Sequence, residues 1–491
     1  MQILIGLLYG GNLRAAAFFC TVHQIMIERA RVMTEDTISQ IATPHGAGGI
    51  GIIRVSGEDA LGVARRVFRP AAGGTLGDIA PYTARYGHIV AADGTVIDEC
   101  ILLYMRAPHS YTGEDTAELQ CHGGAVVLRE VLLRTWEAGA RPAEAGEFTK
   151  RAFLHGRLDL ARAESVMELI AAKSTRAAHA ARERLAGAFS HAVTDIRTQI
   201  LSAVAHIEAG IDFPEDDIPA ASAERLAAEI DAASAAVRRL LAGADTGRVL
   251  RDGVKTVIVG RPNVGKSSLL NALLGMERAI VTDVPGTTRD VIEEEISVAG
   301  IPLRLLDTAG LRAAEDAVEQ IGVARTEQHL MDAELILAVF DASEPLTAED
   351  HALLARLSAA AADTIILCSK EDRPSVLSAE DFAAVAAPVL RISAQEGTGL
   401  DALREEIAAH IVRQEGDLSD GALPNKEREI EALRRAETHL AAAAETLAAD
   451  LGTDFVSIDL RAAYDALGEI LGETVDTDLI DRIFSEFCIG K

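Results

Sequence analysis

Cysteine is scarce in this chain, aromatic residues make up only 4% of it, and basic residues are outnumbered by acidic ones. The five cysteines form no C-x-x-C pair, which predicts a reducing, cytoplasmic setting with neither a disulfide framework nor a zinc site. With 47 Lys and Arg against 75 Asp and Glu, the formal net charge is −28. This excess of acid argues against DNA binding and a general nucleic-acid coat, which need clustered cations, but leaves room for a local basic patch that contacts a structured RNA.

Long hydrophobic runs are also missing. The apolar start, residues 1–11, has no positive region before it and no clear small-residue cleavage site after it, so it makes a poor signal peptide. Elsewhere no run of about 18 uncharged apolar residues occurs, which predicts that the chain does not cross a membrane. Met33 opens a segment that reads as the start of a domain. We therefore expect residues 1–32 to be a flexible extension or the product of a misassigned start codon.

The chain is long and apolar enough for several domains, since 49% of its 491 residues are hydrophobic. Over residues 33–150, the β-like runs GIGIIRVSG, ARYGHIV and CILLYMRAP, with the helical run EDALGVARRVF, predict a compact α+β domain. Residues 252–413 alternate strands with helices, which predicts an α/β domain with a mainly parallel sheet.

The segments on either side of the α/β domain, 151–251 and 414–491, have helical patterns rich in Ala and Leu. In the first of them one helical face is apolar and needs a partner. That face contains Leu226, Ile230, Val237 and Leu241. The economical interpretation is a single all-α domain that an inserted α/β domain interrupts, and two independent helix bundles are the alternative.

A phosphate-binding loop stands near the start of the α/β domain. Residues 260–267, GRPNVGKS, match GxxxxGK[ST], follow an apolar strand and open a helix. In such a loop the backbone N–H groups and the helix N-terminus bind phosphates, Lys266 reaches the outer phosphates, and the Ser267 hydroxyl coordinates Mg²⁺. A glycine-rich turn without chemistry is the alternative, which this strand–loop–helix context disfavours.

Two further motifs follow in the order typical of a nucleotide switch. An apolar strand ends at DTAG, where Asp307 can hold the metal through water and Gly310 can donate its N–H to the terminal phosphate. Between this motif and the phosphate loop lies TDVPGTTRD, residues 282–290. Within it Thr288 is the candidate second Mg²⁺ ligand, on a loop that orders around the terminal phosphate.

Guanine is the base that the next motif favours. SKED ends an apolar strand and has Lys370 and Asp372 at the positions of an NKxD element. A carboxylate there accepts from the ring N–H and the exocyclic amine of guanine, a donor pair that adenine lacks. Ser369 replaces the usual Asn, and the loss of one polar contact costs about 0.5–1.5 kcal/mol, up to roughly tenfold in affinity. RISAQ, residues 391–395, resembles the last base-contacting loop.

These motifs together define the expected GTP site. Its residues are Asn263, Val264, Gly265, Lys266, Ser267, Ser268, Thr282, Asp283, Val284, Pro285, Gly286, Thr287, Thr288, Asp307, Thr308, Ala309, Gly310, Ser369, Lys370, Asp372, Ser393, Ala394 and Gln395.

The residue that orients water for hydrolysis is not evident from the motifs. Many small GTPases carry Gln directly after DTAG, but Leu311 stands there and cannot hydrogen-bond water. The acidic stretch that follows offers Glu315, Asp316 and Glu319. The motifs do not choose among the three, and a solvated acidic loop is the plain alternative.

Motif order, the internal GTTRD and the ending FCIGK together resemble one family, the tRNA modification GTPases MnmE, also called TrmE. The resemblance covers residues 36–491 and includes SYTGEDTAELQCHGG, GEFTKRAFLHGRLDLARAE and IDFPEDDI. It implies a cytoplasmic homodimer, joined through folate-binding N-terminal domains, that forms a heterotetramer with the FAD-containing MnmG (GidA). The pair is implied to add a carboxymethylaminomethyl-type group to C5 of the wobble uridine, position 34, of certain tRNAs. The implied one-carbon donor is 5-formyl- or 5,10-methylene-tetrahydrofolate.

The resemblance also assigns catalytic roles. Family G domains meet in pairs around a potassium ion that replaces an arginine finger, and a cation beside the phosphates offsets developing negative charge. The matching potassium ligands here are Asn263, Thr282, the Val284 carbonyl and Thr287. Glu319 matches the glutamate that orients the attacking water, and Lys266 and Thr288 are the other catalytic candidates of the G domain.

For the folate, the resemblance points to Arg54, Glu118, Arg157 and Lys491. Cations and a carboxylate suit the pterin edge and the glutamate tail. Arg157 stands where the family generally has Lys, so the charge is kept while the geometry shifts. Cys488 lies close to Lys491 in the sequence, and two interpretations stay open: a catalytic thiolate or redox group, or a small apolar residue that packs on the core.

Two other functions compete with this one. A ribosome-assembly switch similar to Era-type GTPases usually carries a basic RNA-binding appendage, such as a KH domain with a GxxG loop, and the sequence contains none. A helical adaptor with a degenerate nucleotide site would hydrolyse no GTP. A comparison of GTP hydrolysis in potassium and in sodium distinguishes these two functions from that of a potassium-activated tRNA modification GTPase.

Overall fold

The computed structural model describes residues 36–44, 46–77, 79–212, 223–276, 294–306, 330–411 and 419–491. These residues form two compact units that alternate along the chain. The first unit contains the chain up to Met167 together with Ser190–Ala236 and Ala432–Lys491, and the second contains Glu168–Phe189 and Val237–Glu431. The extension predicted at residues 1–32 lies outside the described part of the chain.

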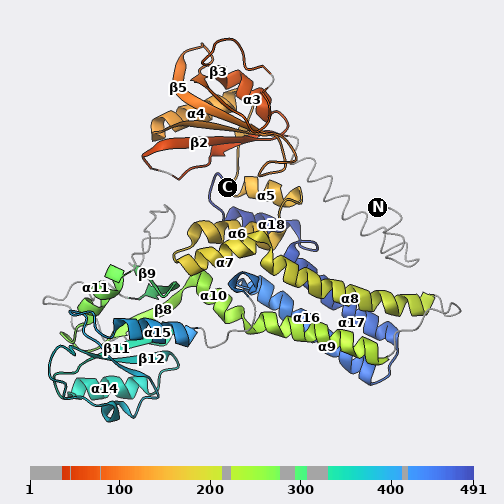
Figure 1. Cartoon of the computed structure of the whole chain (residues 1–491). Coiled ribbons are helices and arrows are strands. Elements are labelled where there is room, and N and C mark those ends of the chain that lie inside the picture. The colour runs from red at the N-terminus through yellow and green to blue at the C-terminus, as the bar shows by residue number, and fades with distance from the viewer. Residues whose placement is uncertain are drawn as a thin grey trace. The chain divides into compact units, whose positions relative to one another are not determined.

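A seven-stranded sheet of order β3-β4-β5-β6-β2-β1-β7 begins the first unit (Figure 1). The strands are β1 (Ile38–Ile41), β2 (Gly48–Ser56), β3 (Phe68–Pro70), β4 (Ala84–Val90), β5 (Val96–Met105), β6 (Thr116–Gly123) and β7 (Arg141–Pro142). Neighbouring strands are antiparallel except β1 and β7. The three predicted β-like runs fall on β2, β4 and β5, so the predicted α+β pattern is confirmed.

Helices α3 (Ala60–Val67) and α4 (Ala125–Glu137) cover one face of this sheet. Side chains alternate between the faces of a strand, and the burial pattern follows that rule. On β5, for example, Leu102 and Tyr104 are buried with α3 and α4, whereas Ile101 is 42% exposed on the other face. The core of this part of the chain therefore lies between the sheet and the two helices.

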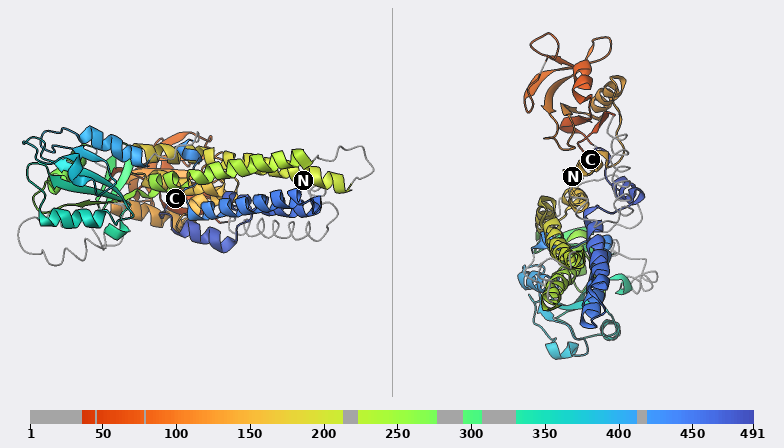
Figure 2. Two further views of the ribbon diagram at one scale, coloured as in Figure 1. Left: turned by 90° about the horizontal axis from the view of Figure 1, so that it is seen from below. Right: turned by 90° about the vertical axis from the view of Figure 1, so that its right-hand side faces the viewer.

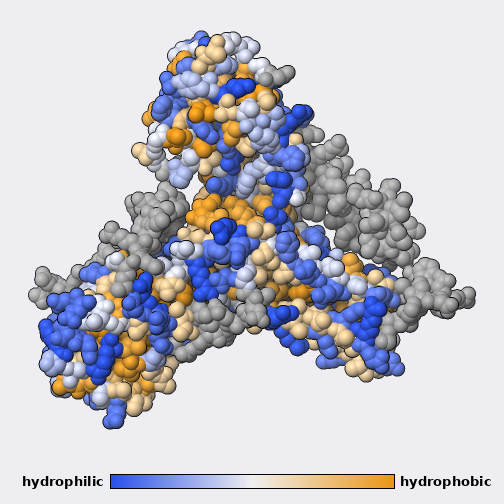
Figure 3. Space-filling model, in the orientation of Figure 1, coloured by the Kyte–Doolittle hydropathy of each residue, from blue (hydrophilic) through white to orange (hydrophobic). Residues whose placement is uncertain are grey.

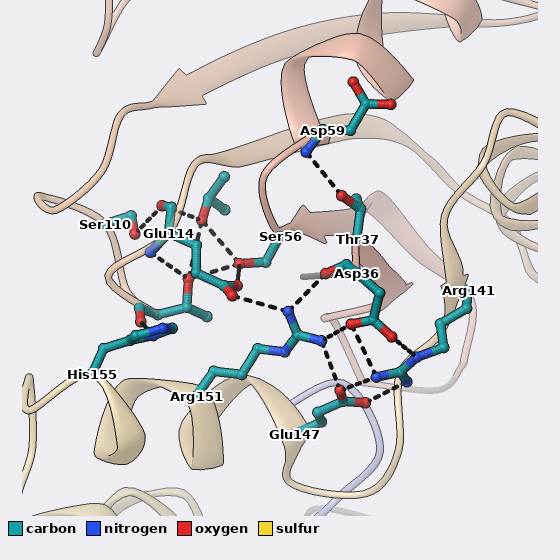
Figure 4. A network of polar contacts seen from close by, with 12 residues as sticks. Asp36, Thr37, Ser56, Asp59, Ser110, Glu114, Arg141, Glu147, Arg151 and His155 are labelled. Carbon is teal, nitrogen blue, oxygen red and sulfur yellow. Dashed lines mark hydrogen bonds and ion pairs between the residues drawn. The ribbon is translucent and has the colours of Figure 1, made fainter. Parts of the chain in front are cut away.

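Helix α5 (Glu147–Leu154) is joined to the sheet by a partly buried ion network (Figure 4). Arg151 is 2% exposed, and its guanidinium lies 2.6 Å from Asp36, 2.9 Å from Glu114 and 3.0 Å from Glu147. Arg141 of β7 pairs with Glu147 at 2.6 Å and with Asp36 at 2.5 Å. The network links segments that are up to 115 residues apart in the sequence.

Two carboxylates of this network have a lowered pKa. Burial alone would raise the pKa of Asp36 and of Glu147, but hydrogen bonds from Arg141 and the charge of Arg151 bring both below their ordinary values. Carboxylates of this kind stabilise the fold above their unfolded pKa of about 4, and the contribution is lost as the pH falls through the folded value. The network is therefore fully stabilising at neutral pH and fails only in acid.

Replacing Arg151 with Met is expected to destabilise the N-terminal part of the first unit by about 3–5 kcal/mol, because it leaves Glu114 buried without a cation. Trp136, the only tryptophan, lies in α4, so its fluorescence during urea unfolding reports on this region. Arg129 is exposed on the same helix, and Arg129→Met should change the unfolding free energy by less than about 0.5 kcal/mol. Equal stability of Arg151→Met and the wild type would contradict the role of the network.

Helices from both sides of the α/β segment lie in the first unit. Helix α8 (Ala188–Asp212) runs beside α17 (Thr453–Leu471) in Figures 1 and 2. Arg197 of α8 pairs at 2.7 Å with Glu473, 276 residues away, and its guanidinium lies 4.1 Å from the ring centre of Tyr464. Helix α18 (Thr477–Ser485) also belongs to this unit, as do the larger parts of α6 (Leu160–Ala171), α9 (Ala223–Ala242) and α16 (Glu427–Ala448), whereas α7 (Thr175–Ala186) and α10 (Ala244–Asp252) belong to the second unit.

The apolar face predicted for α9 is correct except at its end. Leu226, Ile230 and Val237 are at most 1% exposed. Leu240 continues the buried stripe at 2% exposure, whereas the predicted Leu241 is only partly buried. Steps of four and three residues alternate along the stripe, so the residue three after Val237 lies nearer the centre of the buried face than the residue four after it.

A six-stranded sheet of order β13-β12-β11-β8-β10-β9 forms the centre of the second unit. Its strands are β8 (Val254–Val259), β9 (Glu294–Val298), β10 (Ile301–Leu305), β11 (Leu335–Asp341), β12 (Asp363–Ser369) and β13 (Val389–Arg391). All pairs are parallel except β9 with β10, which confirms the predicted α/β sheet.

Helices cover both faces of this second sheet. Helices α11 (Lys266–Met276) and α15 (Leu400–Ile411) pack on one face and α14 (Ala348–Leu357) on the other. Strand β8 lies between β10 and β11. The strands that follow it in the sequence are first added on one side of it, as β9 and β10, and then on the other, as β11, β12 and β13. The carboxyl edge at such a switch point is where α/β sheets bind their ligands. In the part of the chain that the structure describes, no helix is both long and apolar enough to span a bilayer.

Candidate active site

The predicted phosphate loop connects β8 to α11. Gly260 and Gly265 have φ angles of +151° and +105°, and a Cβ on Gly260 would lie 2.4 Å from the Val339 carbonyl oxygen. Only glycine fits that position. Asn263 also has a positive φ, +66°. Backbone in which left-handed and right-handed conformations follow one another points successive N–H groups into one concave surface. Such a surface binds a phosphate.

Lys266 lies across this loop. Its Nζ donates hydrogen bonds to the carbonyl oxygens of Gly260 at 2.7 Å and Arg261 at 2.8 Å. Burial lowers the pKa of Lys266, and an anion bound beside the ammonium group would relieve that cost. Ser267, partly buried, and Ser268, exposed, continue the first turn of α11. The loop thus fits a nucleotide phosphate chain, and the Ser267 hydroxyl fits a Mg²⁺ bound with it.

The two predicted base-contacting loops lie side by side at the carboxyl ends of β12 and β13. Asp372 Oδ1 accepts a hydrogen bond from Ser393 Oγ at 2.9 Å, and Glu371 N donates to the Ile392 carbonyl oxygen at 3.2 Å. Ser393 is fully buried, whereas the side chain of Asp372 is 23% exposed. Ala394 and Gln395 follow Ser393 on the same loop. Asp372 is therefore held in one orientation while part of its carboxylate stays accessible.

Lys370 is held by a residue that the sequence did not single out. Its Nζ lies 2.6 Å from Asp341 Oδ2, at the end of β11. Burial would raise the pKa of Asp341, but the hydrogen bond from Lys370 lowers it below the ordinary value. An Asp that ends an otherwise apolar strand, LILAVFD, beside the nucleotide edge was the signal available in the sequence.

Ser369, the replacement for Asn, binds the phosphate loop. Its Oγ lies 2.5 Å from the Val264 carbonyl oxygen and 3.0 Å from the Phe340 carbonyl oxygen, and the residue is 5% exposed. From the sequence, Ser369 signified only a lost contact with the base. In the structure it connects the end of β12 to the loop that holds the phosphates.

The rest of the predicted GTP site lies outside the described residues. It comprises Thr282, Asp283, Val284, Pro285, Gly286, Thr287, Thr288, Asp307, Thr308, Ala309, Gly310 and Glu319, and the alternatives Glu315 and Asp316 lie there too. Strand β10 runs parallel to β8 and ends two residues before Asp307. Strand β10 therefore ends at the edge of the sheet where the phosphate loop follows β8.

A second candidate site lies in the first unit, around Arg54. Arg54 of β2 and Glu118 of β6 are direct cross-strand partners, with Arg54 Nη2 2.9 Å from Glu118 Oε1. The guanidinium also lies 5.2 Å from the ring centre of Tyr111 and 5.6 Å from that of Phe148. Neither aromatic contact was expected from the sequence. Together the carboxylate and the two rings hold the Arg54 side chain in place.

Lys491, at the end of the C-terminal segment, lies near Arg54 and Glu118. Burial, and next the positive charge of Arg54, lower the pKa of Lys491. Its carbonyl oxygen accepts a hydrogen bond from Phe148 N at 3.1 Å. Arg54 and Lys491 place two cationic donors in this region, and such donors fit carboxylate groups like those of the glutamate tail of a folate.

The other two predicted residues of this region are exposed. Arg157 follows α5, and within the described ranges its guanidinium forms no ion pair. It approaches the SYTGED segment, since its Cγ lies 3.4 Å from the position a Cβ on Gly113 would take. Cys488 carries a free, exposed thiol. An exposed thiol does not fit the interpretation of Cys488 as a small apolar residue packed on the core, and its catalytic or redox role stays a prediction.

A phosphate loop on the central parallel strand, with an oriented carboxylate on a neighbouring strand end, defines the second unit as the nucleotide domain of a P-loop GTP hydrolase. Two family models match the chain: "GTP-binding protein TrmE N-terminus" over residues 37–157 and "MnmE helical domain" over residues 160–488, a range that includes the nucleotide domain. The chain belongs to the MnmE family of tRNA modification GTPases.

Similar proteins named "tRNA modification GTPase MnmE" support this assignment over nearly the whole chain. The relative from Symbiobacterium thermophilum is 51% identical over 460 residues, 94% of this chain and 100% of its own. Those from Heliobacterium modesticaldum and Geobacillus kaustophilus are 48% and 46% identical, again over 94% of this chain and 100% of theirs. Among solved structures, the G domain of the T. maritima FeoB iron transporter is 30% identical over 32% of this chain and 98% of its own, with a TM-score of 0.24.

Proposed function

We propose that this GTPase is activated by potassium and acts with an FAD-containing partner, MnmG (GidA), in a heterotetramer. The pair adds a carboxymethylaminomethyl-type group to C5 of the wobble uridine, position 34, of certain tRNAs. The observation that carries the proposal is that a chain of the MnmE family has a carboxylate, Asp372, oriented by Ser393 in its second unit, and the Arg54–Glu118 pair in its first. We assign the protein to the cytoplasm.

In this proposal the G domain, residues 252–413, binds GTP and Mg²⁺. Lys266 binds the outer phosphates, Ser267 and Thr288 coordinate Mg²⁺, and Asp372 selects guanine. A potassium ion completes the charge balance, with Asn263, Thr282, the Val284 carbonyl and Thr287 as its ligands. The left-handed backbone of Asn263, directly in the phosphate loop, supports a ligand at that position.

The remaining domains have separate tasks. Residues 33–150 bind the folate and form the dimer, while residues 151–251 and 414–491 form one helical domain that ends in FCIGK. Arg54, Glu118, Arg157 and Lys491 hold 5-formyl- or 5,10-methylene-tetrahydrofolate, which supplies the one-carbon unit when bound. Cys488 is the candidate nucleophile beside them, and its exposed thiol supports access to a substrate.

A homodimer joined through the N-terminal domains is supported by the sheet face that α3 and α4 leave open. Ile101 of β5 and Tyr86 of β4 are direct cross-strand partners on that face, 42% and 55% exposed, and Ile50 of β2 is 67% exposed. Hydrophobic side chains reach the surface of this domain in Figure 3. An exposed apolar sheet face of this kind favours association with another protein surface.

Nucleoside analysis of tRNA tests the proposal. A deletion strain should lack the carboxymethylaminomethyl-type modification of wobble uridine, and the wild-type gene should restore it. The Arg54→Met variant should restore it poorly and should bind 5-formyl-tetrahydrofolate at least about tenfold more weakly, because one charged hydrogen bond is lost. Arg129→Met, exposed on α4, is the matched control and should behave as the wild type. Normal modification in the deletion strain would overturn the proposal and favour an Era-type role in ribosome assembly.

A further inference from the structure

The hydroxyl of Ser369 bears on how this chain recognises guanine. Guanine presents a donor pair at N1 and N2, and acceptors at O6 and N7. With the donor pair on Asp372, as proposed above, N7 lies on the opposite side of the ring, and the proposal places that side toward the phosphate loop. Ser369 lies on that side: its Oγ is 3.7 Å from the position a Cβ on Gly265 would take, and 2.5 Å from the Val264 carbonyl oxygen.

Ser369 has only one proton to donate. Its two neighbours within hydrogen-bonding distance, the carbonyl oxygens of Val264 and Phe340 at 2.5 and 3.0 Å, are both acceptors without a proton of their own. The hydroxyl proton is therefore committed to the backbone, and only lone pairs remain. A lone pair cannot bind N7, which is itself an acceptor.

Two other side-chain donors of these two loops also have partners. Lys370 Nζ lies 2.6 Å from the carboxylate of Asp341, and Ser393 Oγ donates to Asp372 at 2.9 Å. An Asn at position 369 would differ in kind, because its amide carries two N–H protons and a carbonyl oxygen. One amide can thus bind a neighbour and still have a proton for the base, which a single hydroxyl cannot do.

We propose that this chain does not recognise N7 of guanine: Ser369 holds the phosphate loop, and base selection rests on Asp372 and the Ser393–Gln395 loop. The inference depends on the guanine site proposed above. The protein should therefore tolerate a change at N7, because a guanine nucleotide with carbon in place of N7 loses no contact with it. This chain should bind such a nucleotide as tightly as the natural one.

The test is a competition experiment on the full-length protein, with GDP, 7-deaza-GDP and ADP displacing a fluorescent GDP. Wild-type protein should bind GDP and 7-deaza-GDP within about twofold of each other, because no hydrogen bond is lost. A larger preference for GDP overturns the proposal. If GDP and ADP bind equally, the guanine site itself is wrong, which is a different failure.

Two variants at position 369 complete the test. Ser369→Asn should acquire an N7 donor and prefer GDP over 7-deaza-GDP by about two- to tenfold. Ser369→Ala loses the bond to the phosphate loop, so it should weaken GDP and 7-deaza-GDP by the same factor. A loss confined to GDP in Ser369→Ala would mean that the hydroxyl does contact N7 and would overturn the proposal. If Ser369→Asn fails to fold, the proposal is still tested by the ratio of GDP to 7-deaza-GDP affinity in the wild-type protein and by Ser369→Ala.

Discussion

Asp372→Asn is expected to lower the affinity for GTP by more than about 100-fold, because two hydrogen bonds to a charged carboxylate are lost at about 1.5–3 kcal/mol each. The guanine amine would face the new amide N–H₂, donor against donor. Xanthine carries a carbonyl oxygen where guanine has that amine. The variant should therefore bind xanthosine triphosphate better than GTP, with the amide donating to the new oxygen.

The geometry around Asp372 makes this change of specificity plausible. Ser393 Oγ donates to Asp372 Oδ1, and an Asn at position 372 can keep that bond through its own carbonyl oxygen. The side chain would then keep its orientation, with the amide nitrogen toward the base. Asp401→Asn is the control, because the Asp401 side chain is 90% exposed at the start of α15. Competition binding with both nucleotides is the measurement, and unchanged GTP affinity of Asp372→Asn would contradict the guanine site.

Glu319→Ala is expected to leave GTP binding near normal and to abolish potassium-stimulated hydrolysis. A residue that orients or activates the attacking water contributes about 10²–10⁴-fold to the rate, and Leu311, after DTAG, cannot take that role. Single-turnover hydrolysis in potassium buffer separates this loss from a binding defect. Glu315→Ala and Asp316→Ala are the matched controls on the same acidic stretch. If Glu319→Ala hydrolyses GTP at the wild-type rate, the role passes to one of those two residues.

The parts of the site that the sequence predicted are those formed by contiguous residues. GRPNVGKS contains the glycines, the lysine and the helix start within eight positions, so its local geometry follows from the motif. The role of Ser369 could not be predicted, because its partner Val264 is 105 residues away. The motif indicated which residue was missing at this position but not what the replacement would bind.

The folate region shows the same limit. Arg54 and Glu118 face each other because β2 and β6 pair in one particular register, which no local pattern specifies. The resemblance to a family identified the pair, whereas Tyr111 and Phe148 became visible only in the fold. Similarly, the partly buried ion network depends on packing: nothing in the sequence marks Arg151 as more important than the neighbouring charged residues.

The central claim of the proposed function is that a monovalent cation completes the GTPase site. The direct measurement is the rate of GTP hydrolysis by the full-length protein in potassium chloride and in sodium chloride at equal ionic strength. We predict hydrolysis at least about tenfold faster in potassium, because the ion stabilises the charge that develops on the phosphates. Equal rates in the two salts would contradict the claim.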